Sequence, residues 1–151
     1  MKKIFLSLAA VALMGISAFA NGNDEIVSQK TLAAFKSDFT NATNPTWEQK
    51  DGFIKATFSF NGQVLFAYYD NEGQLKAVVR NIVSDQLPLN LLASLKKDYA
   101  DYWITDLFEI SADGQTTYYA TVENSNKKIV LKSDDVSSWD VYSKERKAEV
   151  Q

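Results

Sequence analysis

The stretch LAAFKSDF at residues 32–39 returns as LASLKKDY at residues 92–99. The two octets agree in residue type at nearly every position, which chance does not explain. In both octets the apolar residues fall at i, i+3 and i+7, a spacing that places them on one stripe of an α-helix facing a core. These apolar positions are Leu32, Phe35 and Phe39, and Leu92, Leu95 and Tyr99. The sequence therefore predicts two equivalent amphipathic helices.

The residues around the octets predict where the helices begin and end. Pro88 suits the first turn of the second helix, with Asp85 or Gln86 near its N-cap, because proline lacks only an N–H that a helix start leaves unpaired. The pair Asn44-Pro45 is expected to close off the first helix, since proline cannot continue one.

After the first octet the apolar period changes to two. Ile54, Ala56, Phe58 and Phe60 alternate with polar residues, which is typical of a half-buried strand. Asn61-Gly62 then predicts a hairpin turn. Further strands are expected at residues 63–69 and, after the turn at Asp70 to Gly73, at residues 75–82.

After the second octet the pattern runs in parallel. Strands are expected at residues 106–111, 118–123 and 127–133 and near residues 139–142, separated by Asp113-Gly114 and Asn124-Ser125-Asn126. Residues 143–151 are mostly charged without an apolar period, so they are expected to form a frayed C-terminal tail.

Each half of the chain is thus expected to be one helix followed by three or four antiparallel strands. Neither half alone hides its apolar face well, so the two should share one core. Helices on one side of an antiparallel sheet make a two-layer α+β fold. The sequence predicts a tandem duplication, with units at residues 21–84 and 85–151.

The N-terminus has the order of a secretory signal peptide, predicted at residues 1–20. Two lysines are followed by an uncharged apolar run from Ile4 to Ile16 and by small residues ending at Ala20. The run is short for a membrane span, which needs roughly 20 apolar residues. Since the chain has no cysteine to carry a lipid anchor, the product cut after Ala20 is expected to be soluble, without a stable membrane anchor, and periplasmic or secreted.

Composition removes several classes of function. Without residues 1–20 the chain carries 14 basic and 19 acidic side chains, a net charge of −5, and no basic run that could follow a phosphate backbone. Nucleic-acid binding is therefore not expected. The absence of histidine and cysteine removes Ser-His-Asp and Cys-His catalysis, thiol redox chemistry and zinc sites of the usual nitrogen and sulfur type.

The sequence patterns for the remaining kinds of catalytic or metal site are weak. Ser94 to Lys97 and Ser125 to Lys128 match the Ser-x-x-Lys nucleophile motif, but the accompanying Lys-Thr-Gly is absent. Asp134 and Asp135 are adjacent, and on a strand adjacent side chains point to opposite faces. The turn at Asp70 to Gly73 faintly resembles a calcium loop but lacks the ligand spacing of an EF-hand. No catalytic residue, metal ligand or cofactor is therefore predicted.

The aromatic residues predict a binding surface. The strand parity that turns Ile54, Ala56 and Phe58 toward a helix leaves other aromatic residues on the opposite face of the sheet, where large exposed aromatic side chains are candidate contacts for a partner. The candidate partner-binding residues are Phe53, Phe66, Tyr68, Tyr119, Lys128 and Lys132. Four alternatives stay open: a loop, the tail or a second subunit covers this face, or the parity is shifted by one residue.

Five features follow one another along the chain. They are the helix with its A-F-K-x-D-F pattern, Trp47-Glu48, the hairpin over residues 53–69, the Asp70-x-x-Gly73 turn and the leucine-proline opening of the second helix. This series resembles the PepSY-like, beta-lactamase-inhibitor-like (BLIP-like) periplasmic proteins of Bacteroides and relatives. The resemblance covers the chain after the signal peptide. It implies a duplicated helix-plus-four-strand unit and a largely undefined biochemical role. The namesake's inhibitory activity is not carried over, because no inhibitory residues are matched.

The sequence thus favours an exported, non-enzymatic periplasmic binding or inhibitory module, which holds an unidentified protein or peptide through an aromatic sheet face. The alternative is a periplasmic carrier of a small ligand or of calcium. A hydrolase that uses carboxylates is a third reading. The oligomeric state stays open.

Overall fold

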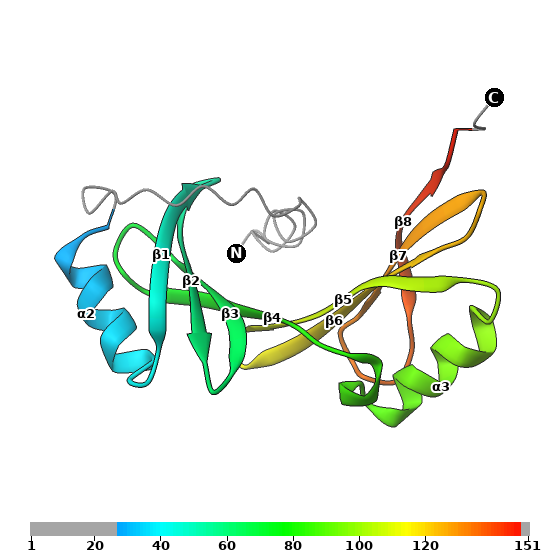
Figure 1. The fold of residues 1–151 in the computed structure, drawn as a ribbon, viewed down its shortest axis with the longest axis horizontal. Helices are drawn as coiled ribbons and strands as arrows, with labels where there is room; N and C mark the ends of the chain where they lie inside the picture. The colour runs from blue at the N-terminus through cyan, green and yellow to red at the C-terminus, as the bar shows by residue number, and fades with distance from the viewer. Residues whose placement is uncertain (1–26, 149–151) are drawn as a thin grey trace. The chain divides into compact units, whose positions relative to one another are not determined.

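The chain forms two compact units, one extending to Val79 and the other beginning at Arg80. The computed structural model describes residues 27–148, so the predicted signal peptide lies outside the described residues. Each unit consists of one α-helix beside antiparallel strands (Figure 1). The fold class is therefore α+β, as predicted. None of the helices described between residues 27 and 148 has the length and apolar character that a membrane span requires.

The first unit begins with a helix and continues as strands. Helix α2 (Gln29–Asp38) is followed by β1 (Thr43–Lys50), β2 (Phe53–Phe60), β3 (Gln63–Tyr69) and β4 (Leu75–Asn81), whose last two residues belong to the second unit. Strand β2 pairs antiparallel with β1 and with β3.

The second unit repeats this order. After the short 3-10 helix η1 (Ser84–Gln86) come α3 (Leu89–Asp98), β5 (Trp103–Ala112), β6 (Gln115–Glu123), β7 (Lys127–Ser133) and β8 (Asp140–Arg146). Strands β5 to β8 pair antiparallel in chain order.

Both predicted helices are present, and both end at the aromatic residue that closes each octet. The N–H of Phe39 donates to the carbonyl oxygen of Phe35 at 2.9 Å, and the N–H of Tyr99 donates to that of Leu95 at 3.0 Å. Ser28 caps the start of α2, where its Oγ accepts from the N–H of Thr31 at 3.1 Å. The octets therefore contain the last turn and the C-cap of each helix.

The predicted end of the first helix at Asn44-Pro45 is wrong. Helix α2 ends at Asp38, and Asn44 and Pro45 lie in β1. Asn44 has a φ of 52°, and the pairing of β1 with β2 shifts register between Thr43 and Thr46. Such an irregularity accommodates proline in a strand, because the missing N–H then breaks no ladder hydrogen bond.

The helix-facing strand residues predicted for the first unit are confirmed. Phe35 of α2 is 5% exposed and packs edge-on against Phe58, with ring centroids 4.9 Å apart. The strand residues of this core are Ile54, Ala56, Phe58, Leu65, Ala67 and Tyr69. Phe39, Trp47 and Phe60 pack against it while half-buried. The alternation read from the sequence thus gave the correct parity.

The second unit has a core of the same design. Leu91 and Leu95 of α3 are buried with strand residues Leu107, Tyr118, Ala120, Val122, Ile129 and Leu131, and with Ile82 and Leu87. Each of these two clusters draws all its residues from one unit, and a core shared by the two units stays a prediction.

The predicted frayed tail at residues 143–151 is wrong for residues 143–146, which belong to β8. Val130 pairs with Ser143 and Lys128 with Glu145, and the Nζ of Lys147 lies 2.7 Å from a carboxylate oxygen of Glu123. Strand β8 pairs with β7 on one side and is largely exposed, so it needs no apolar alternation.

Candidate functional site

The predicted sheet-face residues of the first unit lie on the side away from α2. Lys55 pairs with Tyr68 and Thr57 with Phe66, whereas the alternate pair Ala56 and Ala67 belongs to the helix-facing core. The parity of this strand pair is therefore correct.

Their exposure differs from the prediction. Tyr68 is 3% exposed, and burial together with the nearby carboxylate of Glu48 raises its pKa to about 12. Phe66 is half-buried, and the ammonium of Lys55 lies 5.0 Å from the centre of its ring. The same ammonium lies 2.7 Å from a carboxylate oxygen of Glu48. Phe53 is half-buried. The expected exposure of Tyr68 is wrong.

In the second unit the tyrosine predicted on the sheet face is also covered. Tyr119 is 3% exposed, stacks on Phe108 at a centroid distance of 5.0 Å and meets the ring of Tyr142 edge-on at 5.7 Å. Burial raises the pKa of Tyr119. The expected exposure of Tyr119 is therefore wrong, because neighbouring rings on the same face enclose it. Tyr142 lies in β8, a strand to which the prediction from strand parity was not applied.

The predicted lysines on this face are half-buried. The Nζ of Lys132 lies 2.7 Å from a carboxylate oxygen of Asp134. Lys128 pairs across the sheet with Glu123 and Glu145. A role of these lysines in binding a partner stays a prediction.

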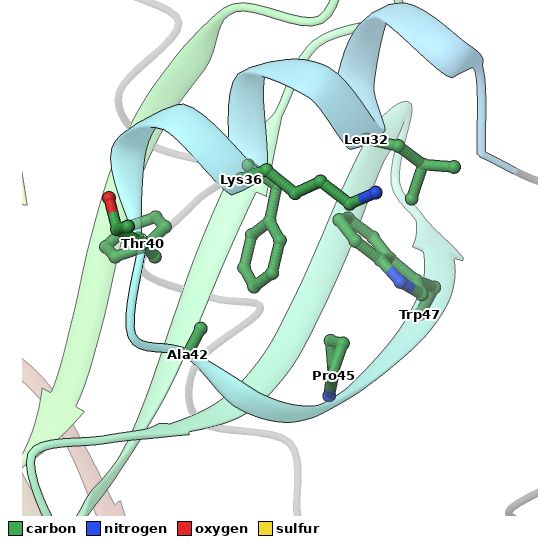
Figure 2. Close-up of a pocket in the computed structure, with 8 residues that line it drawn as sticks. Leu32, Lys36, Thr40, Ala42, Pro45 and Trp47 are labelled. Atoms are coloured by element: carbon green, nitrogen blue, oxygen red, sulfur yellow. The ribbon is translucent and has the colours of Figure 1, made fainter.

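The first unit contains a groove of about 190 Å³ between the C-terminal half of α2 and the start of β1. Figure 2 shows Lys36 reaching from α2 across this groove toward Trp47. The ring of Phe35 meets those of Trp47 and Phe39 at centroid distances of 5.1 and 5.6 Å. The groove is lined by Leu32, Phe35, Lys36, Phe39, Thr40, Ala42, Pro45 and Trp47.

The second unit contains a groove of about 280 Å³ in the equivalent place. Six of its lining residues stand sixty positions after a lining residue of the first groove, the same offset that relates the two octets. These six are Leu92, Leu95, Lys96, Tyr99, Ala100 and Tyr102. Ser84, Ile104 and Val122 complete the lining. We call the two the α2 groove and the α3 groove.

The two grooves have similar linings but differ in their aromatic side chains. Both have an apolar floor, and in both the charged lining residue is a lysine, Lys36 or Lys96. The α2 groove is walled by the rings of Phe35, Phe39 and Trp47, whereas the α3 groove carries the hydroxyl groups of Tyr99 and Tyr102, whose rings meet edge-on at 5.7 Å. Burial and the nearby Asp98 raise the pKa of Tyr99.

Similar structures are known, although no protein-family model and no curated protein matches the sequence. A BLIP-like protein from Bacteroides fragilis superposes with a TM-score of 0.68 at 20% identity, over 82% of this chain and 91% of that chain. This chain has a BLIP-like fold. A DUF2874 family protein from Bacteroides uniformis superposes with a TM-score of 0.70 at 14% identity, over 80% and 89% of the two chains.

A third structure with the BLIP-like fold comes from Bacteroides eggerthii and is described provisionally as a periplasmic protein. Its TM-score is 0.69 at 13% identity, and the match covers 79% of this chain and 88% of that chain. At these identities the likeness concerns the fold, so the chemistry of the site has to come from the residues of this chain.

The serines of the two Ser-x-x-Lys motifs occupy ordinary structural positions of this BLIP-like fold. Ser94 donates from its Oγ to a carboxylate oxygen of Asp98 at 3.0 Å on the exposed side of α3. Ser125 lies in the bend between β6 and β7.

The carboxylates singled out in the sequence bond to different partners. Asp134 accepts from Thr117 and Lys132, whereas Asp135 accepts from Ser137. Oδ1 of Asp70 accepts from the backbone N–H groups of Glu72 and Gln74 at 3.1 and 2.8 Å. Within residues 27–148, no three side chains of the His, Cys, Asp and Glu types gather as metal ligands would.

The grooves were missed by the sequence reasoning, although their signal was present. Lys36 and Lys96 occupy the same position in the two octets, and both are exposed. An exposed residue contributes little to a core, so core packing does not explain why the lysine recurs. Its recurrence next to core positions was therefore the sequence signal that could have indicated the grooves. Trp103, 68% exposed at the start of β5, was also not predicted.

Proposed function

We propose that this chain is an exported, non-enzymatic binding module of the periplasm, whose α2 and α3 grooves hold segments of a protein or peptide partner. The observation that carries the proposal is the equivalence of the two grooves, which share six lining positions at one offset. An open apolar cleft with one polar anchor is a common form of binding site.

The proposal includes a duplication of one ancestral unit. A helix followed by four strands occurs twice, and the octets match along the last turns of both helices. A duplication accounts for repeated core positions through packing alone. It does not require the lysine at the groove to recur, so retention of Lys36 and Lys96 supports a shared role.

Periplasmic location is part of the proposal. The signal-like residues 1–20 support export, and a similar structure from Bacteroides eggerthii carries a provisional periplasmic description. The binding site is assigned to the grooves rather than to the sheet face, because Tyr68 and Tyr119 are each 3% exposed and offer little surface to a partner.

In-cell photo-crosslinking tests the proposal. A photoreactive phenylalanine analogue is placed at Thr40 or Ala100, which line the two grooves. Ala33 and Ala93 serve as matched controls, because they are exposed on the same two helices but do not line a groove. Crosslinks to a periplasmic protein or peptide are expected at the groove positions alone. Equal crosslinking at Ala33 and Ala93, or crosslinks confined to Phe66 and Lys128 on the sheet face, would place the binding surface elsewhere.

The alternative of a small-ligand or calcium carrier is less well supported. Pockets for drug-sized ligands span about 300–1,000 Å³, and the grooves measure about 190 and 280 Å³. In the calcium-like turn, Oδ1 of Asp70 already accepts two backbone N–H groups. The volumes of the grooves favour a segment of a larger partner.

A further inference from the structure

We infer that each groove takes one large apolar side chain of an acidic peptide segment, and that the lysine at its rim contacts a carboxylate next to that side chain. The inference rests on the proposed function and names the chemistry of the occupant. Four properties of the grooves lead to it: size, lining, charge, and the difference between the two.

The size of the grooves selects a single side chain. Volumes of about 190 and 280 Å³ fall below the range of about 300–1,000 Å³ that encloses a whole drug-sized ligand. Both grooves are open to the surface, so the remainder of an occupant can continue outside. A side chain attached to a peptide backbone meets both conditions.

The lining selects an apolar side chain. In the α2 groove the rings of Phe35, Phe39 and Trp47 present faces and edges, which attract aromatic and branched aliphatic groups. In the α3 groove Leu92, Leu95 and Val122 provide the same apolar floor. Burial of apolar area against these residues is the main attraction available at either site.

The lysine at the rim of each groove favours an acidic residue next to the inserted side chain of the peptide. Lys36 and Lys96 are exposed, and neither takes part in an ion pair found within residues 27–148. No carboxylate lines either groove. A cation beside an apolar pocket favours a partner with a carboxylate at that point.

The two grooves should differ in the side chain that they prefer. The α3 groove is the larger and carries the hydroxyl groups of Ser84, Tyr99 and Tyr102, which can bond to a polar tip. The α2 groove is smaller and lacks tyrosine. We expect leucine or phenylalanine in the α2 groove and tyrosine or tryptophan in the α3 groove.

Titration of the mature chain with short peptides, followed through backbone amide NMR shifts, tests the inference. The probes are the acetylated, amidated peptides Gly-Asp-Phe-Asp-Gly and Gly-Asp-Tyr-Asp-Gly. Versions with lysine in place of aspartate, or alanine in place of the ring, are the ligand controls. The acidic aromatic peptides should shift amides around Thr40 to Trp47 and Ala100 to Ile104, at least about tenfold more tightly than the lysine versions. The alanine versions should cause no saturable shift.

Charge reversal at the rim provides the matched variants. Lys36→Glu and Lys96→Glu should each remove the preference for aspartate at their own groove and leave the other groove unchanged. Lys30→Glu and Lys97→Glu make the same charge change on the same helices without lining a groove, and should leave binding unaltered. Thr40→Trp and Ala100→Trp should block one groove each.

Three outcomes would overturn the inference. The first is equal affinity for aspartate and lysine peptides, and the second is a set of shifts confined to the sheet face. The third is saturable binding of sodium octanoate in the grooves with no binding of the peptides, which would assign them to a fatty acid. If crosslinks form at Thr40 and Ala100 but the acidic peptides do not bind, the proposed binding function stands and the inferred occupant is wrong.

Discussion

The indole N–H of Trp139 donates a hydrogen bond of 2.9 Å to the backbone carbonyl oxygen of Leu91. Leu91 lies in α3 and is fully buried, whereas Trp139 precedes β8 and packs half-buried against the core of the second unit. The bond ties the segment before the last strand to the helix that carries the α3 groove, although the two residues are far apart in the sequence.

Replacing Trp139 by phenylalanine should lower the free energy of unfolding by about 1 kcal/mol or slightly more. The indole donor is lost, and a typical hydrogen bond contributes about 1 kcal/mol net. Urea denaturation measures the change. Trp103→Phe is the control, because Trp103 is 68% exposed and surface substitutions usually stay within about 0.5 kcal/mol. Equal effects of the two substitutions would show that the bond contributes no stability.

Truncating Phe35 to alanine should cost about 3 kcal/mol or more, the usual cost of removing a buried phenylalanine side chain. Phe35 is 5% exposed and its ring contacts those of Phe39, Trp47 and Phe58. Leu89→Ala is the control on the other helix, since Leu89 is 82% exposed. A loss below about 1 kcal/mol for Phe35→Ala in denaturant unfolding would contradict the packing of α2.

Gly73→Ala should destabilise the chain more than Gly52→Ala. Both glycines have positive φ, 76° and 82°, so both substitutions introduce the strain of a left-handed backbone, about 1–2 kcal/mol. A Cβ at Gly73 would also lie 3.2 Å from the backbone nitrogen of Thr31 in α2, whereas at Gly52 nothing lies within 4 Å. The difference in urea midpoint between the two variants therefore reports the contact of this turn with α2. Equal midpoints would contradict that contact.

Stability should fall as pH rises above about 10. Burial raises the pKa of Tyr68 to about 12 from an ordinary value of 10.0. The folded chain thus holds this phenolic proton more tightly than the unfolded chain, and the favourable contribution is complete below pH 10 and is lost as pH rises toward 12. Urea midpoints between pH 8 and pH 11.5 measure the decline.

Burial also raises the pKa values of Tyr69 and Tyr119, so they add to this alkaline loss. Tyr68→Phe removes one titrating group and should make the decline shallower without abolishing it. A decline of unchanged steepness in Tyr68→Phe would show that the Tyr68 hydroxyl ionises normally.

The sequence by itself determined the local structure of this protein. The recurring octets predicted both helices, because a spacing of three and four residues is a property of one helix regardless of its surroundings. The alternation from Ile54 to Phe60 predicted which side chains face α2, since successive side chains on a strand point to opposite faces. The turns at Asn61-Gly62 and Asp113-Gly114 followed from residues that accept positive φ.

Only the tertiary structure decided what covers each face and where the surface is hollow. Parity placed Tyr119 on the outer face, but the rings of Phe108 and Tyr142 come from other strands, so its burial could not be read from its own segment. The charged strand β8 showed no apolar alternation because most of its side chains are exposed. The grooves depend on how closely each helix approaches the first strand after it. That distance is set by the packing of Phe35 against Trp47 and of Leu95 against its strands, and no local pattern encodes it.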